Sequence, residues 1–215
     1  VNCTINVSGE SMNASNFDFQ IPLLSLPTLF NTNLNNIPFS NSYLKTSKDK
    51  DYEWSKKLNL TKKKLNIAIA YSGNPEYYGD SERSAKLEIF YPLIDRANLF
   101  LIQKEIKKED ELFLKKNPQI KFIGKDIDNF DDLASVIQNM DLVISTDTSI
   151  PHLAGAIGKK VFILLGRLAD WRWSLNSNIT PWYNSATLLR KKLNPKSKTE
   201  DWSDAFEAII KELKI

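Results

Sequence analysis

The chain has 215 residues, of which 42% are hydrophobic and 26% are charged. These fractions are typical of a globular domain, and they exclude a disordered or collagen-like chain. No run of about 18 apolar residues is present, so the sequence contains no candidate transmembrane segment. The length predicts one domain of ordinary size with a short appendage.

The net charge is only +3, from 29 Lys and Arg against 26 Asp and Glu. Short basic patches such as Lys62–Lys64 and Lys115–Lys116 favour solvated helix ends and loops. Because nucleic-acid-binding domains more often carry a one-sided basic excess, we expect no nucleic-acid partner. The single cysteine, Cys3, cannot form an internal disulfide, and no secretory signal is visible. We therefore expect a cytoplasmic location.

The first 45 residues are rich in Asn, Ser and Thr and carry little charge. Within them, the apolar segment 21–30 (IPLLSLPTLF) contains two prolines, which oppose both a long helix and a central strand. We predict a short helical turn within an extended arm that docks on another surface. Residues 1–45 are therefore assigned to an N-terminal arm or linker, and residues 46–215 to the main domain.

From Leu65 onward, apolar runs alternate with segments of helical periodicity. The expected strands are Asn66–Tyr71, Leu99–Ile102, Ile120–Phe122, Leu142–Ser145 and Val161–Leu165. The expected helices are Asp49–Leu58, Leu87–Ile94, Lys108–Lys116, Asp131–Asn139, Ser149–Ile157 and Asp201–Leu213. Several strands are apolar throughout, which indicates burial on both faces. The pattern predicts an α/β fold with a doubly wound, mostly parallel, Rossmann-like sheet.

In such a sheet, ligands bind outside the carboxyl ends of the strands. The loops expected there are 72–84, 103–107, 146–149 and 166–178. Candidate functional residues should therefore be sought in these four loops.

The segment 141–158 (DLVISTDTSIPHLAGAIG) is the most informative part of the chain. A buried strand leads into Asp147, Thr148 and Ser149, and Pro151 fits the first turn of the following helix. Free N–H groups and hydroxyls at a helix start form an anion site, to which His152 would add a hydrogen bond. In the alternative interpretation, Asp147 or Thr148 only caps the helix and His152 is only packed.

Other common sites are not supported by the sequence. It has no GxGxxG dinucleotide fingerprint, no Walker motif and no GxSxG nucleophile elbow. One histidine and one cysteine exclude the common zinc sites.

The segment 141–165, ADWRW at 169–173 and PWY at 181–183 resemble the carboxyl-terminal domain of bacterial GT-B glycosyltransferases. These enzymes are related to glycosyltransferase family 9, the heptosyltransferase-like group. The likeness is greatest to proteins that carry this domain behind tetratricopeptide repeats. The resemblance runs from about Phe19 to the end of the chain.

The resemblance implies a binding site for a nucleotide-diphosphate sugar donor, with an unknown glycan or protein as acceptor. Asp147, Thr148, Ser149 and His152 would face the diphosphate, beside a close-approach loop formed by Gly73 and Asn74. Gln103, with Lys104 beside it, would contact the base or ribose, and Arg83 would offset phosphate charge. The expected donor-binding residues are thus Gly73, Asn74, Arg83, Gln103, Asp147, Thr148, Ser149, His152 and Arg172. No cofactor and no metal are expected, since side chains and the helix dipole would stabilise the leaving group.

Two groups of residues keep more than one interpretation. The aromatic residues Trp171, Trp173, Trp182 and Tyr183 either pack a long loop onto the domain or stack on a sugar or base. Arg172 between two tryptophans suits phosphate recognition. Of the carboxylates near the first loop, Glu76, Asp80 and Glu82, none is singled out as a base, so the catalytic residues stay unassigned.

A GT-B enzyme needs two Rossmann-like domains, on the order of 300 residues or more. This chain accommodates one, so we expect a donor-binding fragment that lacks the acceptor half and is inactive by itself. The alternative is a non-catalytic nucleotide-sugar-binding or interaction module. A GT-B-fold epimerase is a third hypothesis.

Overall fold

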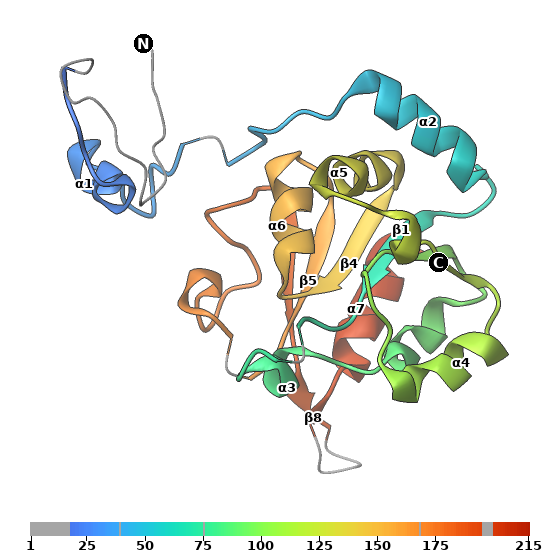
Figure 1. Cartoon of the computed structure of the whole chain (residues 1–215). Coiled ribbons are helices and arrows are strands. Elements are labelled where there is room, and N and C mark those ends of the chain that lie inside the picture. The colour runs from blue at the N-terminus through green and yellow to red at the C-terminus, as the bar shows by residue number, and fades with distance from the viewer. Residues whose placement is uncertain (1–17, 39, 75, 168, 195–199) are drawn as a thin grey trace. The chain divides into compact units, whose positions relative to one another are not determined.

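The structure is a computed structural model that describes residues 18–38, 40–74, 76–167, 169–194 and 200–215 (Figure 1). Cys3 and the first part of the proposed arm lie outside the described residues. The chain divides into two compact units, Val1–Ile37 and Pro38–Ile215.

In the first unit, a 3₁₀ turn (η2, Leu23–Ser25) leads into one turn of helix (α1, Leu26–Leu29). Pro27 stands in the first turn of α1, where its missing N–H removes no helical hydrogen bond. The short helical turn predicted for this segment is therefore confirmed. Leu24 and Phe30 are largely exposed, and docking of this unit on another surface stays a prediction.

The second unit is built on a six-stranded sheet in the order β3-β2-β1-β4-β5-β6. Each neighbouring pair of these strands is parallel. The strands are β1 (Asn66–Ala70), β2 (Asn98–Leu101), β3 (Ile120–Phe122), β4 (Leu142–Thr146), β5 (Val161–Leu165) and β6 (Ala186–Arg190). This confirms the predicted doubly wound, Rossmann-like α/β fold, in which helices cover both faces of the sheet (Figure 1).

The helical segments connect these strands. The α-helices are α2 (Lys48–Leu58), α3 (Asp80–Arg83), α4 (Glu111–Lys116), α5 (Phe130–Asn139), α6 (Ser149–Ala156) and α7 (Ser203–Leu213). The 3₁₀ turns are η3 (Leu87–Leu93), η4 (Lys108–Asp110), η5 (Gly124–Asp126) and η6 (Trp171–Trp173). A small antiparallel pair, β7 (Lys192–Leu193) and β8 (Glu200–Asp201), precedes α7. No helix in the described part of the chain is both long and apolar enough to cross a membrane.

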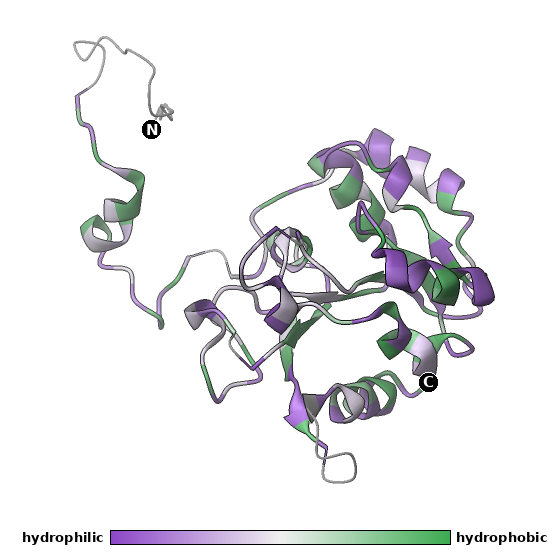
Figure 2. Ribbon diagram, turned by 60° about the horizontal axis from the view of Figure 1, so that its bottom comes forward, coloured by the Kyte–Doolittle hydropathy of each residue, from purple (hydrophilic) through white to green (hydrophobic). Residues whose placement is uncertain are grey.

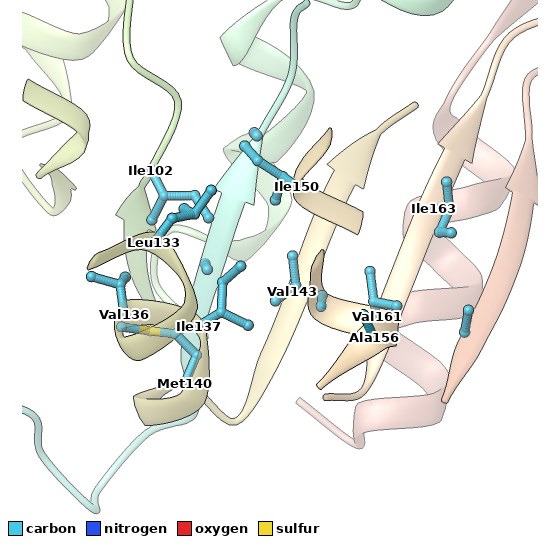
Figure 3. Close-up of a cluster of buried hydrophobic side chains, with 14 of the residues drawn as sticks. Ile102, Leu133, Val136, Ile137, Met140, Val143, Ile150, Ala156, Val161 and Ile163 are labelled. Atoms are coloured by element: carbon cyan, nitrogen blue, oxygen red, sulfur yellow. The ribbon is translucent and has the colours of Figure 1, made fainter. Parts of the chain in front are cut away.

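Successive side chains of each strand point to opposite faces of the sheet, so the hydrophobic core forms two layers. In β1, Ala68 and Ala70 face the layer that contains α2, α5 and α6, whereas Ile67 and Ile69 face η3 and α7. Figure 3 shows the first layer, with Ile137 of α5 lying beside Val143 of β4. The strands are mostly hydrophobic, and the helices present hydrophilic residues outward (Figure 2). Burial on both faces explains why the strands read as continuous apolar runs.

The sequence-based expectations differ most from the structure at segment 87–94, at β6 and at Asp201. Segment 87–94 was expected to be an α-helix, but Leu87–Leu93 forms a 3₁₀ helix that contains Pro92, which cannot donate an α-helical hydrogen bond. Strand β6 was not predicted, because this edge strand alternates between buried and half-buried residues and lacks a continuous apolar run. Asp201, expected to start the last helix, lies in β8 instead.

Residues 40–44, here called the strap, lie beside α6 and are held there by hydrogen bonds. The backbone N–H groups of Tyr43 and Leu44 donate to the carbonyl of Ala156, at 2.8 and 3.0 Å. The N–H of Asn184 donates to the carbonyl of Ser40 at 2.9 Å. The strap is thereby fixed against both the end of α6 and the PWY segment.

Candidate functional site

The sheet has its topological switch point between β1 and β4. These two strands are neighbours, and the chain continues outward from them in opposite directions, to β2 on one side and β5 on the other. Their pairing brings Ala70 level with Ser145 at the carboxyl edge. The loop after β1 and the loop between β4 and α6 therefore diverge at this point, which is where a crevice forms in such folds.

The predicted anion motif forms the start of α6. Thr148 is the N-cap, and its hydroxyl oxygen accepts from the backbone N–H of Ile150 at 3.3 Å. Pro151 lies in the first turn, as the sequence predicted. The capping interpretation of Thr148 is thus confirmed, and the Ser149 side chain stays exposed. A cap occupies one acceptor lone pair of Thr148 and leaves its hydroxyl proton available to a ligand.

A cleft of about 840 Å³ lies at this edge of the sheet. Its walls come from the loops after β1, β2 and β3 and from the starts of α5 and α6. The residues that line it are Ser72, Gly73, Asn74, Glu76, Arg83, Ile102, Gln103, Lys104, Glu105, Gly124, Ile127, Asp128, Asn129, Phe130, Leu133, Thr148, Ser149 and Ile150. Two helix N-termini, each the positive end of a helix dipole, thus contribute to one cavity.

Arg83 connects the β1 loop to the β4–α6 loop. Its Nε donates to Asp80 at 3.2 Å, and its Nη1 donates to the backbone carbonyl of Asp147 at 3.1 Å. The guanidinium lies 4.6 Å from the centre of the Tyr77 ring. A Cβ atom on Gly73 would collide with the guanidinium, so glycine permits this close approach. Asn74 accepts from the N–H of Glu76 and shapes the outer part of the same loop.

Asp80 anchors this arrangement from below. Its side chain is almost fully buried and also lies 3.6 Å from Nζ of Lys107. Burial alone would raise the pKa of Asp80, but hydrogen bonds from Ser84 and Arg83 and the charges of Lys107 and Arg83 outweigh it. The pKa of Asp80 is therefore lowered, and the residue is an ionised partner of Arg83 rather than a carboxyl group poised to take up a proton.

Gln103 is buried at the back of the cleft. Its Oε1 accepts from the N–H of Tyr71 at 2.8 Å, and its Nε2 donates to Ser72 Oγ and to the carbonyl of Glu105. Its amide therefore fastens the end of β1 to the β2 loop. A contact of Gln103 with a base or ribose stays a prediction, and any such contact has to share these bonds.

His152 lies in a separate, more aromatic environment on α6. Its Nδ1 is 3.0 Å from the hydroxyl of Tyr183, and its ring stacks on Trp173 with centroids 5.1 Å apart. Its Nε2 lies 3.8 Å from the carboxylate of Asp147. His152 and Asp147 are therefore close neighbours, but neither lines the cleft that contains Thr148 and Ser149.

The surroundings of His152 keep its imidazole neutral. Burial lowers its pKa from the usual value of 6.5, and the positive charge of Arg172 lowers it further. The carboxylates of Asp147 and Asp170 act in the opposite direction without outweighing burial. His152 is thus a neutral hydrogen-bonding group at pH 7 and does not supply a positive charge.

The segment after β5 carries the tryptophans and Arg172. Nε of Arg172 lies 3.2 Å from Asp170, and its side chain is about half exposed. Trp173 is fully buried, whereas Trp171 is largely exposed and contacts Trp182 edge-on. Packing is therefore the role of Trp173, while Trp171 remains accessible to a ligand.

The predicted site residues therefore fall into two groups. Gly73, Asn74, Arg83, Gln103, Thr148 and Ser149 line the cleft, and Asp147, His152 and Arg172 lie in the aromatic group beside it. Sequence reasoning missed the start of α5, where Asn129 caps the helix by accepting from the N–H groups of Asp131 and Asp132. The signal was present, because Asn followed by acidic residues and an apolar periodic run is a helix-start pattern.

The strand order and the covering helices define a Rossmann-like domain with a cleft at its switch point. Comparison with known families and structures adds a more specific likeness. Residues 115–209 match the family Glycosyltransferase family 9 (heptosyltransferase). No curated protein matches the chain.

Among solved structures, ADP-heptose lps heptosyltransferase II of E. coli is 14% identical, with a TM-score of 0.51, over 70% of this chain. A glycosyl transferase family 9 protein of Veillonella parvula is 16% identical, with a TM-score of 0.55, over 81%. E. coli heptosyltransferase WaaC with ADP is 16% identical, with a TM-score of 0.50, over 72%. The chain spans 46% of each of these structures. At this level of identity, the likeness establishes a shared fold.

Proposed function

We propose that this domain binds the nucleotide-diphosphate sugar donor of a glycosyltransferase. The observation that carries the proposal is the cleft at the switch point, whose walls include the starts of α5 and α6 and the guanidinium of Arg83. The match of residues 115–209 to Glycosyltransferase family 9 supports the same conclusion. A volume of about 840 Å³ lies within the range of small-molecule sites.

The geometry suggests how the donor would lie. The hydroxyls of Thr148 and Ser149 and the positive end of the α6 dipole would face a diphosphate, and Arg83, bonded to the carbonyl of Asp147, adds a positive charge beside them. Apolar residues of the same cleft, including Ile102, Ile127 and Phe130, offer a surface to a base. These fixed donors would stabilise the charge that develops on a leaving nucleoside diphosphate. A donor site without a metal ion stays part of the proposal.

The chain spans under half of its structural neighbours, and we propose that it represents the donor-binding half of a GT-B enzyme. The acceptor and a general base would then come from another domain, so the isolated chain would not transfer sugar. A tetratricopeptide-repeat context, a bacterial source and a cytoplasmic location belong to the same proposal. Incubating the chain with labelled donor sugars tests it, because sugar transfer to an added acceptor would contradict the inactive-half assignment.

Isothermal calorimetry with ADP, UDP and GDP tests donor binding directly. ADP belongs in the panel because it is named with one structural neighbour, E. coli heptosyltransferase WaaC. We expect at least one nucleotide to bind, more weakly to His152→Ala and to Ser149→Ala. Lys211→Ala, at the far end of α7, serves as the control and should bind like the unaltered chain. Absence of binding by all three nucleotides at millimolar concentration would refute the nucleotide site.

A further inference from the structure

A series of neighbouring side chains leads from the strap to the start of α6, which lines the cleft. Tyr43 of the strap is close enough to Tyr183 to help raise the pKa of its hydroxyl. That hydroxyl lies 3.0 Å from Nδ1 of His152, and Nε2 of His152 lies 3.8 Å from Asp147. Asp147 directly precedes the N-cap of the helix that lines the cleft.

The chemistry of these groups determines which of them donates and which of them accepts a hydrogen bond. A carboxylate accepts hydrogen bonds and does not donate them, so the Asp147 charge favours the tautomer of His152 that carries its proton on Nε2. Nδ1 is then an acceptor, and the hydroxyl of Tyr183 must donate to it.

The packing holds Tyr183 in this position. Its ring lies so close to Gly155 of α6 that a Cβ atom there would collide with the ring carbons. The Tyr183 side chain is largely buried, and its neighbour Asn184 is fastened to the strap by two hydrogen bonds, one from its backbone N–H and one from its side chain. The hydroxyl therefore has little freedom to leave His152.

We propose that Tyr183 is a positioning residue of the donor site: its hydroxyl fixes the tautomer of His152, so that Nε2–H faces Asp147 and steadies the loop before Thr148. The effect on ligand binding rests on the proposed function, whereas the tautomer assignment is a property of the ligand-free chain.

Titration of His152 reports this arrangement, and the groups that face it are known. Asp147 approaches from the β4–α6 loop, Asp170 and Arg172 act from the segment around η6, and Tyr183 approaches from the PWY segment. A hydrogen bond donated to Nδ1 exists only while the imidazole is neutral. Removing it therefore raises the pKa of His152, whereas removing an acceptor from Nδ1–H would lower it.

The chain has one histidine, so ¹⁵N NMR of the imidazole is unambiguous. In the unaltered chain we expect the Nε2–H tautomer with a hydrogen-bonded Nδ1, and a dominant Nδ1–H tautomer would overturn the proposal without any variant. In Tyr183→Phe, which keeps the ring, we expect the pKa of His152 to rise by about half a unit to one unit, as an ordinary net hydrogen bond implies. A fall or no change would overturn it. Tyr91→Phe, at an exposed tyrosine of η3, should leave the pKa unchanged.

The ligand-binding consequence is measured separately. With the nucleotide that binds best, Tyr183→Phe should weaken affinity about three- to tenfold, the effect of one ordinary hydrogen bond. Combined with His152→Ala it should add almost nothing, because both variants remove the same interaction. Full additivity would contradict the proposal. If no nucleotide binds, the donor-site proposal fails, while the NMR result still decides the tautomer assignment.

Discussion

The two groups of candidate residues meet at the start of α6 and yet differ in environment. Thr148 and Ser149 line the open cleft, whereas His152, one turn later, is stacked on Trp173 and lies within hydrogen-bond distance of Tyr183. A single helix start thus presents hydroxyls and N–H groups to a cavity on one side and a neutral histidine to an aromatic cluster on the other. Residues adjacent in a motif therefore need not contact the same part of a ligand.

The comparison predicts that truncation in the aromatic cluster affects stability most. Trp173→Ala should lower the free energy of unfolding by about 3–5 kcal/mol, because it empties a fully buried site against His152. Trp171→Ala, two residues earlier and largely exposed, should change it by less than about 1 kcal/mol. Urea unfolding of both variants measures the difference. Equal losses would show that the two tryptophans do not have separate roles.

Gly155 offers a second test of the packing around Tyr183. The informative result is whether its substitution raises or lowers the free energy of unfolding. Replacing glycine by alanine inside a helix ordinarily stabilises it by up to about 1 kcal/mol. Here the new methyl group would meet the Tyr183 ring, so Gly155→Ala should instead destabilise the domain by about 1–3 kcal/mol. Thermal or urea unfolding decides between the two signs, and stabilisation would mean that Tyr183 does not pack on α6 as described.

The cleft side should show its effects in nucleotide binding. Arg83→Ala should weaken nucleotide affinity about tenfold or more, since a charged hydrogen-bond donor to phosphate is worth about 1.5–3 kcal/mol. Arg172→Ala should have a smaller effect, because Arg172 does not line the cleft. Calorimetry of both variants tests this order. A larger loss for Arg172→Ala would place the diphosphate in the aromatic group instead.

The smallest expected effect is the pH dependence of folding stability that His152 causes. The pKa of His152 is lowered in the folded chain, so the unfolded chain binds the proton more readily. The stability contributed by His152 is therefore complete above its unfolded pKa of about 6.5 and is lost as pH falls through and below that value. Urea unfolding between pH 5.5 and 7.5 should show this decline in the unaltered chain. The His152→Gln variant should lack it, and an equal slope in both would contradict the assignment.

The fold could be predicted well from the sequence, because strands that are buried on both faces consist of continuous runs of apolar residues. Ile120–Phe122 and Val161–Leu165 were placed with the bounds they have in the structure. β6 was not predicted, because its half-buried positions interrupt the apolar run. The start of α6 was also located correctly, since capping and helix-start residues act within a few positions.

The site was less predictable because its contacts join distant segments. Nothing local to Gln103 says that its amide is bonded to the end of β1, and nothing near Arg83 says that it reaches the carbonyl of Asp147. The same holds for Tyr183 and His152, which lie 31 positions apart. Such pairings depend on how the loops fold over the sheet edge.

Binding of a nucleotide in the cleft at the switch point can be mapped by amide NMR with ADP, UDP and GDP. For whichever nucleotide binds, we expect saturable shifts of the N–H signals of Gly73, Ser149 and Ile150, which line the cleft. Signals from α7, on the opposite face of the sheet, should stay in place. Saturable shifts confined to residues outside the cleft, or none with any of the three nucleotides, would show that the cleft is not a nucleotide site.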